Sequence, residues 1–117
     1  MTEEEKRKAL DLASRLSDKF SPKASIAFIQ KHSNLEFIDD LKLLYALVTD
    51  KEYSVDKKTY LAIAGAIAYV VLATDVIPDF IPLLGFGDDA FVVSMMIRQF
   101  RGEIERYKEF VKQRDER

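Results

Sequence analysis

Residues 60–73 read YLAIAGAIAYVVLA, a run of fourteen apolar and small residues without a charge. The run predicts a helix that is apolar on every side, which belongs either at the centre of a core or in contact with lipid. Fourteen residues rise about 21 Å at about 1.5 Å each, short of the roughly 30 Å of hydrocarbon in a bilayer. We therefore expect a core helix rather than a membrane span, with Gly65 where another helix approaches closely.

Three shorter helices are expected before this run. Thr2 and Glu5 have the spacing of a capping box, and apolar residues then recur at helical intervals as far as Phe20. Ser21-Pro22 supplies an N-cap and a proline at the first helical position of a second helix, which runs toward His32. Ser33 and Glu36 repeat the capping box and open a third helix, which ends at the polar residues 49–54. Its apolar face comprises Phe37, Ile38, Leu41, Leu44, Tyr45 and Val48.

A fifth helix is predicted from Asp88 or Asp89 to Lys112. Its apolar residues alternate by four and three, which is a heptad seam: Val93, Ile97, Phe100, Ile104, Tyr107 and Val111. We expect this seam to pack against the first or third helix of the same chain, and a homodimer through the seam is the alternative. The polar ending, residues 112–117, is expected to fray.

Length and composition favour one compact all-α bundle of about five helices over residues 1–117. Hydrophobic residues make up 48% of the chain and charged residues 32%, as in a globular protein. The net charge of -2 argues against a nucleic-acid partner. The chain has no cysteine, which excludes disulfides and sulfur-ligated zinc, and its acidic start is unlike a signal peptide. A cytoplasmic location is expected.

An acidic connection, residues 75–89, follows the apolar run and reads DVIPDFIPLLGFGDD. Asp79 could cap a short turn, and Asp88 or Asp89 could cap the fifth helix. Asp75 does not fit this interpretation, because a negative charge is unfavourable near the C-terminal end of a helix.

The sharper hypothesis gathers Asp75, Asp79, Asp88 and Asp89 into an oxygen-rich site for Mg²⁺ or Ca²⁺, with hydrolytic chemistry as an extension. No EF-hand spacing supports it. No catalytic residues are assigned, because the single histidine, His32, provides neither a Ser-His-Asp set nor a histidine-based zinc site, and is expected at a helix end. An enzyme is therefore not the first interpretation.

The segment Tyr69 to Asp89 resembles the signature of the YkvA-like family, also called the domain of unknown function 1232. The family's Asp-x-Ile/Leu-Pro-Asp-x-Ile/Leu-Pro-x-x-Gly-x-x-Asp-Asp appears here from Asp75 to Asp89, and residues 60–97 form the family core region. The family commonly has Ser-Pro shortly before the first Asp. This chain has Leu72-Ala73 there, so its apolar helix can continue to about Asp75.

The resemblance implies a small helical module that is often associated with membranes and occurs in bacteria or attached to other domains, including an endoplasmic-reticulum ubiquitin ligase. It implies no established reaction. We therefore expect an interaction module that presents residues 75–89 to a protein partner or a membrane surface, in the cytoplasm and peripheral to the membrane. A carboxylate site for Mg²⁺ or Ca²⁺ is the alternative.

Overall fold

The computed structural model describes residues 3–75 and 89–116, without the side chains of residues 5, 6, 8–10, 12, 73–75 and 89–92. All regular structure in these residues is helical, which confirms the all-α prediction. The elements in chain order are α1 (Glu3–Arg15), the 3-10 turn η1 (Ser17–Lys19), α2 (Pro22–Lys31), α3 (Ile38–Thr49), α4 (Lys57–Asp75), α5 (Asp89–Gln99) and α6 (Arg101–Asp115).

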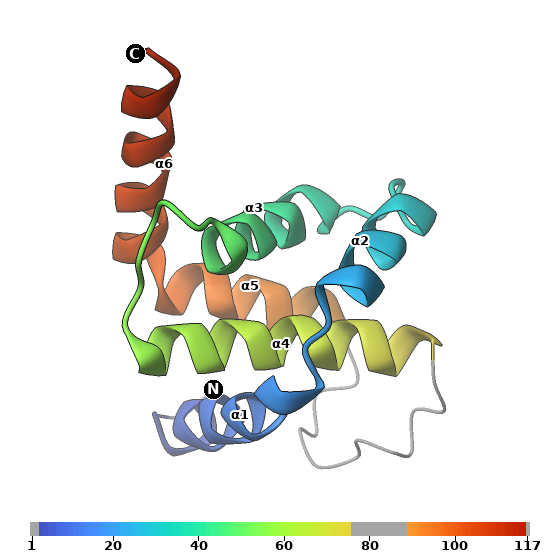
Figure 1. Cartoon of the computed structure of the whole chain (residues 1–117). Helices are drawn as coiled ribbons and strands as arrows, with labels where there is room; N and C mark the ends of the chain where they lie inside the picture. Colours follow the sequence, from blue (N-terminus) through green and yellow to red (C-terminus); the bar gives the residue numbers. More distant parts are fainter. Residues whose placement is uncertain (1–2, 76–88, 117) are drawn as a thin grey trace.

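Helix α4 is the centre of the bundle and packs against α1, α2, α3 and α5 (Figure 1). Residues 62–71 are all buried, so the apolar run is a core helix, as predicted. The helix is longer than expected, with 19 residues that rise about 28 Å. It begins early because the carbonyl of Asp56 accepts the N–H of Tyr60 at 3.0 Å, and the Asp56 carboxylate accepts the Thr59 hydroxyl at 2.5 Å.

The core draws large side chains from α2, α3, α4 and α5. Met95 and Met96 lie within it. The largest fully buried side chains are Phe28, Leu41, Leu44, Leu47, Ile63, Ile67, Met96, Val70 and Val93.

Gly65 lies where α1 crosses α4. A Cβ atom at this position would lie 3.2 Å from the Cα of Ala13 and would overlap the carbonyl group of the same residue. The predicted close approach of another helix at Gly65 is confirmed, and glycine is needed because the backbone of α1 fills the space of a side chain.

The start of α2 was predicted correctly, and the start of α3 was not. The Ser21 hydroxyl accepts the N–H of Ala24 at 3.1 Å and caps α2. The predicted Ser33–Glu36 capping box is wrong, because the chain makes two tight turns there instead. The Leu35 N–H donates to the carbonyl of His32, and the Ile38 N–H donates to that of Leu35, both at 3.1 Å. Helix α3 therefore begins only at Ile38, without a side-chain cap.

The single fifth helix was also a wrong prediction, because the chain bends at Phe100 (φ -111°, ψ 28°) and divides into α5 and α6. Helix α6 turns sharply away from α5 in Figure 1. The bend lets Val93 pack in the core from α5, while Ile104 and Tyr107 pack there from α6. The seam thus packs within its own chain and against α3, as expected.

The expected fraying of residues 112–117 is wrong for the part that the structure describes. Helix α6 continues to Asp115. Arg114 fixes its last turn by ion pairs to Asp50 and Glu52, both at 2.9 Å.

Candidate functional site

The acidic connection joins the C-terminal end of α4 to the N-terminal end of α5. These helices pack against each other and run in opposite directions (Figure 1). Asp75 is the last residue of α4, and Asp89 is the first residue of α5. Asp79 and Asp88 lie outside the described residues, and so do the side chains of Asp75 and Asp89. The convergence of the four carboxylates therefore stays a prediction.

The two acids that lie within helices have opposite electrostatic environments. The prediction that α4 continues unbroken to Asp75 is confirmed, which places this residue at the negative end of the helix dipole. Asp89 lies at the positive end of α5, where a carboxylate is favourable. Helix-end electrostatics thus account for Asp89 but not for Asp75.

The described part of the chain contains no group of three or more His, Asp or Glu side chains that could hold a metal ion. His32 is the C-cap of α2, and its N–H donates to the carbonyl of Phe28 at 2.9 Å. The two rings are in contact, with centroids 4.4 Å apart. This is the helix-end position that the sequence predicted for His32.

A polar cluster at the opposite end of α4 was not predicted. Asp50, between α3 and α4, accepts hydrogen bonds from Arg114 Nη1 at 3.1 and 2.9 Å and from the Tyr107 hydroxyl at 2.9 Å. The Glu52 N–H donates to the same carboxylate at 3.0 Å. The cluster therefore fastens α6 to the chain that connects α3 to α4.

The pKa values in this cluster follow from burial and hydrogen bonding. Burial favours the neutral form of Asp50, but its hydrogen bonds from Glu52, Tyr107 and Arg114 outweigh it and lower the pKa of the carboxyl. Burial, reinforced by the bond to the Asp50 carboxylate, raises the pKa of Tyr107 to about 12. Both shifts hold the cluster in one state at neutral pH: an ionised carboxylate and a protonated phenol.

An aromatic contact extends this cluster. Tyr53 donates its hydroxyl to Glu103, and its ring lies against Tyr107 and Phe110, with centroids 4.9 and 5.1 Å apart. Tyr53 and Glu103 are 50 residues apart in the sequence, and Asp50 and Arg114 are 64 apart. Sequence patterns did not reveal these contacts, because they indicate only pairs that are a few residues apart. The cluster ties helices together, and none of its groups has the surroundings of an activated nucleophile or base.

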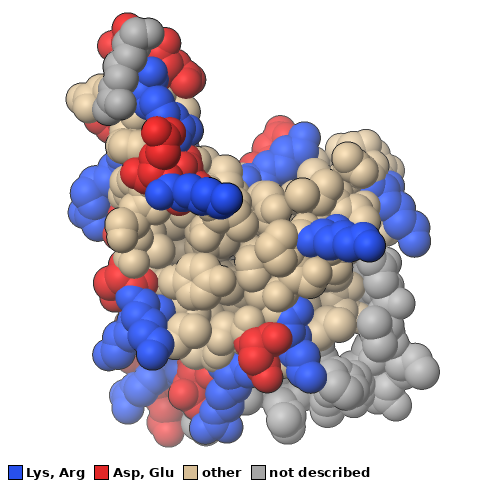
Figure 2. Space-filling model, viewed as in Figure 1, with Lys and Arg blue, Asp and Glu red and all other residues tan. Residues whose placement is uncertain are grey.

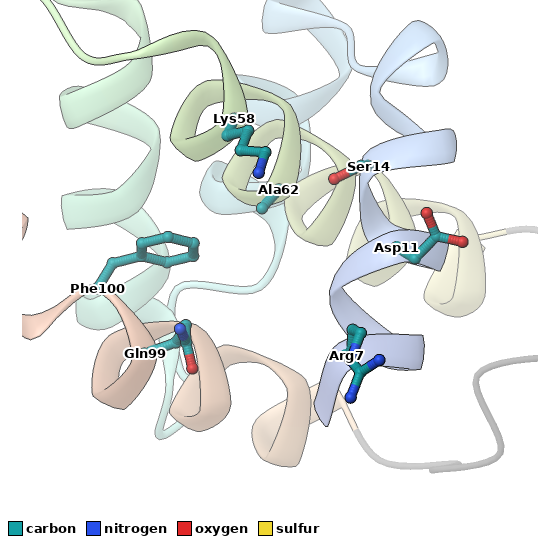
Figure 3. Close-up of a pocket in the computed structure, with 7 residues that line it drawn as sticks. All are labelled: Arg7, Asp11, Ser14, Lys58, Ala62, Gln99 and Phe100. Carbon is teal, nitrogen blue, oxygen red and sulfur yellow. The ribbon is translucent and has the colours of Figure 1, made fainter. Parts of the chain in front are cut away.

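Two of the surface hollows of the bundle are lined by residues that the structure describes. One, of about 390 Å³, lies between α1, the start of α4 and the bend at Phe100 (Figure 3). The other, of about 310 Å³, lies between α3 and α6 beside Val111. Neither was predicted from the sequence.

The surface in Figure 2 has a broad area without acidic or basic side chains, and both kinds lie at its margins. On the projecting helix α6, acidic and basic side chains are mixed. Among the helices that the structure describes, none combines the length and the apolar character needed to cross a membrane.

Comparison with known proteins gives two matches. Residues 59–95 match the family model described as "Protein of unknown function (DUF1232)". A stretch of 53 residues is 40% identical to the "Uncharacterized membrane protein YkvA" of Bacillus subtilis (strain 168) and covers 45% of this chain and 50% of that protein. The match thus spans about half the length of this curated relative. No solved structure matches the chain.

The family model begins at residue 59 and ends at residue 95, so it covers most of α4, the acidic connection and the first half of α5. Neither match carries a described activity. Residues 59–95 thus carry the similarity to the YkvA-like DUF1232 family, whose description gives no function.

Proposed function

We propose that this protein is a small helical interaction module that engages a membrane surface through residues 75–89. The observation that carries the proposal is the apolar composition of this segment. Residues 62–71 of α4 and Val93, Met95 and Met96 of α5 are buried inside the bundle. The connection between their adjacent ends adds a further seven large apolar residues, which are Val76, Ile77, Phe80, Ile81, Leu83, Leu84 and Phe86.

Phenylalanine, leucine and isoleucine side chains that lie next to polar residues in the sequence are suited to the interface of a membrane, where lipid headgroups meet acyl chains. A membrane surface is favoured over a protein partner because the YkvA relative bears the name of a membrane protein. The four aspartates of the segment would be repelled by anionic lipid. The membrane surface that fits best is therefore zwitterionic, and binding should not depend on salt.

The proposal is tested by flotation of the purified protein with phosphatidylcholine vesicles. We expect the protein to float with them, and replacement of a fifth of the lipid by phosphatidylserine should not increase the bound fraction. The double variant Phe80→Ser/Phe86→Ser should lose binding, because two large apolar side chains no longer enter the lipid. The matched control is Ile26→Ser/Tyr60→Ser, which removes large apolar residues that are 44% and 36% exposed on α2 and α4.

Equal flotation of the two double variants would contradict a lipid contact through this segment. Another outcome is that the protein stays in the soluble fraction and a pull-down retains one stoichiometric partner, which the Phe80→Ser/Phe86→Ser variant loses. This result would show that the segment binds a protein and not a membrane. Recovery in a membrane fraction that resists alkaline wash would contradict a surface contact and indicate insertion.

A further inference from the structure

The hollow in Figure 3 combines an apolar floor with a cationic rim. Its floor is Ala62, which is 4% exposed, and the half-buried ring of Phe100. Lys58, Ser14 and Phe100 point into the space between the helices, and Gln99 and Arg7 lie at its edge (Figure 3). The volume of about 390 Å³ falls within the range of small-molecule sites.

The rim has more positive than negative charge available to a ligand. Arg7 and Lys58 both line the hollow, and neither takes part in an ion pair between the side chains that the structure describes. Asp11 is the acidic residue of the lining, but its carboxylate pairs with Arg15 at 2.9 Å and points away from Phe100 (Figure 3). An anion in the hollow would thus face two cations and no unpaired carboxylate of the described lining.

We propose that this hollow binds a small organic anion with a flat apolar part, the class of an aromatic carboxylate. The apolar part lies on Phe100 and Ala62, where contact with an aromatic ring stabilises it. The carboxylate lies between Arg7 and Lys58, and the Gln99 amide and Ser14 hydroxyl provide further donors. The site is formed by helices whose bounds do not include the acidic connection, so it is independent of the proposed membrane contact.

Two backbone contacts place residues of this site. The Phe100 N–H donates to the carbonyl of Met96 at 3.0 Å, so Phe100 continues the last turn of α5 at the point where α6 turns away. The close contact of α1 with α4 at Gly65 brings Ser14 beside Ala62.

The test is a titration of ¹⁵N-labelled protein with 2-naphthoate, followed by amide chemical shifts. We expect saturable shifts clustered at residues 7–14, 58–62 and 99–102. Arg7→Gln and Lys58→Gln should each weaken binding about threefold, as expected for exposed ion pairs, and the double variant about tenfold. Asp11→Asn should leave the affinity unchanged or raise it. The matched control is Lys57→Gln, an exposed lysine beside Lys58 that does not line the hollow.

Two further probes define the ligand class. The neutral 2-naphthamide should bind at least threefold more weakly than 2-naphthoate, because it lacks the charge that Arg7 and Lys58 recognise. Inorganic phosphate should give no saturable shifts, because it does not use the apolar floor. Equal binding of naphthoate and naphthamide, equal affinity in the Arg7→Gln/Lys58→Gln and Lys57→Gln variants, or no shifts at millimolar naphthoate would each overturn the proposal.

Discussion

The backbone carbonyl of Ala13 occupies the space in which a side chain of residue 65 would begin. The obstacle is backbone rather than the mobile end of a side chain, so α1 and α4 must separate to admit even a methyl group. We expect Gly65→Ala to lower the free energy of unfolding by about 1 to 3 kcal/mol, and Gly65→Leu by more. Urea denaturation monitored by circular dichroism measures the loss.

Gly102 is the matched control for this prediction. It lies in the first turn of α6, and a Cβ there would meet only Arg106 Nη1 at 3.7 Å, an ordinary contact. Gly102→Ala should therefore stabilise the protein by about 0.5 to 1 kcal/mol, because alanine is the better helix former. Similar losses of stability in both variants would mean that helix propensity, rather than close packing, governs position 65.

The Asp50–Arg114 pair should be the most important ion pair for holding α6. Its side chains are only 11% and 28% exposed, and Arg114 bonds both carboxylate oxygens. Arg114→Gln should lower the free energy of unfolding and speed amide exchange in the last turns of α6. Arg106→Gln, whose own side chain is 68% exposed, should change the free energy of unfolding much less. Equal effects would show that Asp50 stays solvated.

Tyr107 gives the protein an alkaline limit of stability. Folding holds the proton on its phenol, so the stabilisation is complete below the unfolded pKa of about 10 and is lost as the pH rises to about 12. At pH 7 the wild type should be more stable than Tyr107→Phe, which lacks the bond to Asp50. Urea denaturation at intervals from pH 7 to 12 should show this advantage shrinking above pH 10. A constant difference would contradict the raised pKa.

The fold was predicted from the sequence where the signal was local and the packing followed from it. The apolar run of residues 60–73 specified a core helix, because no exposed face was available to it. Ser21-Pro22 specified the start of α2. Ser33 and Glu36 had an equally good local pattern, but the chain forms turns there instead, in which the carbonyls of His32 and Leu35 accept the N–H groups of Leu35 and Ile38. A capping motif thus predicts a helix start only where no competing turn uses the same residues.

The bend at Phe100 shows a different limit. A heptad pattern records which residues are apolar, and it is unchanged when a helix bends in the middle of the seam. The bend lets both α5 and α6 pack against α3, a contact between segments far apart in the sequence. The cluster around Asp50 and the hollow beside Lys58 depend on the same long-range packing. The acidic connection is different, because its motif was visible in the sequence, although its geometry was not.

The acids at the ends of α4 and α5 should have opposite effects on stability. Asp75→Asn removes a negative charge from the C-terminal end of a helix and should raise the free energy of unfolding by about 0.3 to 1 kcal/mol. Asp89→Asn removes a negative charge from the N-terminal end of a helix and should lower the free energy of unfolding by a similar amount. Both effects should shrink in high salt. A loss of stability in Asp75→Asn would mean that this carboxylate has a specific partner.

The cation hypothesis makes a separate prediction for the same residues. A ligand that binds only the folded state must raise the melting temperature of the protein. If the four carboxylates converge, they should bind Mg²⁺ or Ca²⁺, and the Asn variants should bind the ion more weakly. If the acids serve helix ends alone, the wild-type melt should be the same in chelator and in millimolar amounts of either ion, and we expect this result. Asp79→Asn and Asp88→Asn should then have small effects on stability, because Asn caps about as well as Asp.

The metal site would be established if either ion raised the melting temperature of the wild type and raised it less in the Asp75, Asp79 and Asp88 variants. If the cation raised the melting temperature of Asp75→Asn as much as that of the wild type, the metal site would not include Asp75. Asp75 would then be expected to pair with a basic group of a binding partner or of the first three helices.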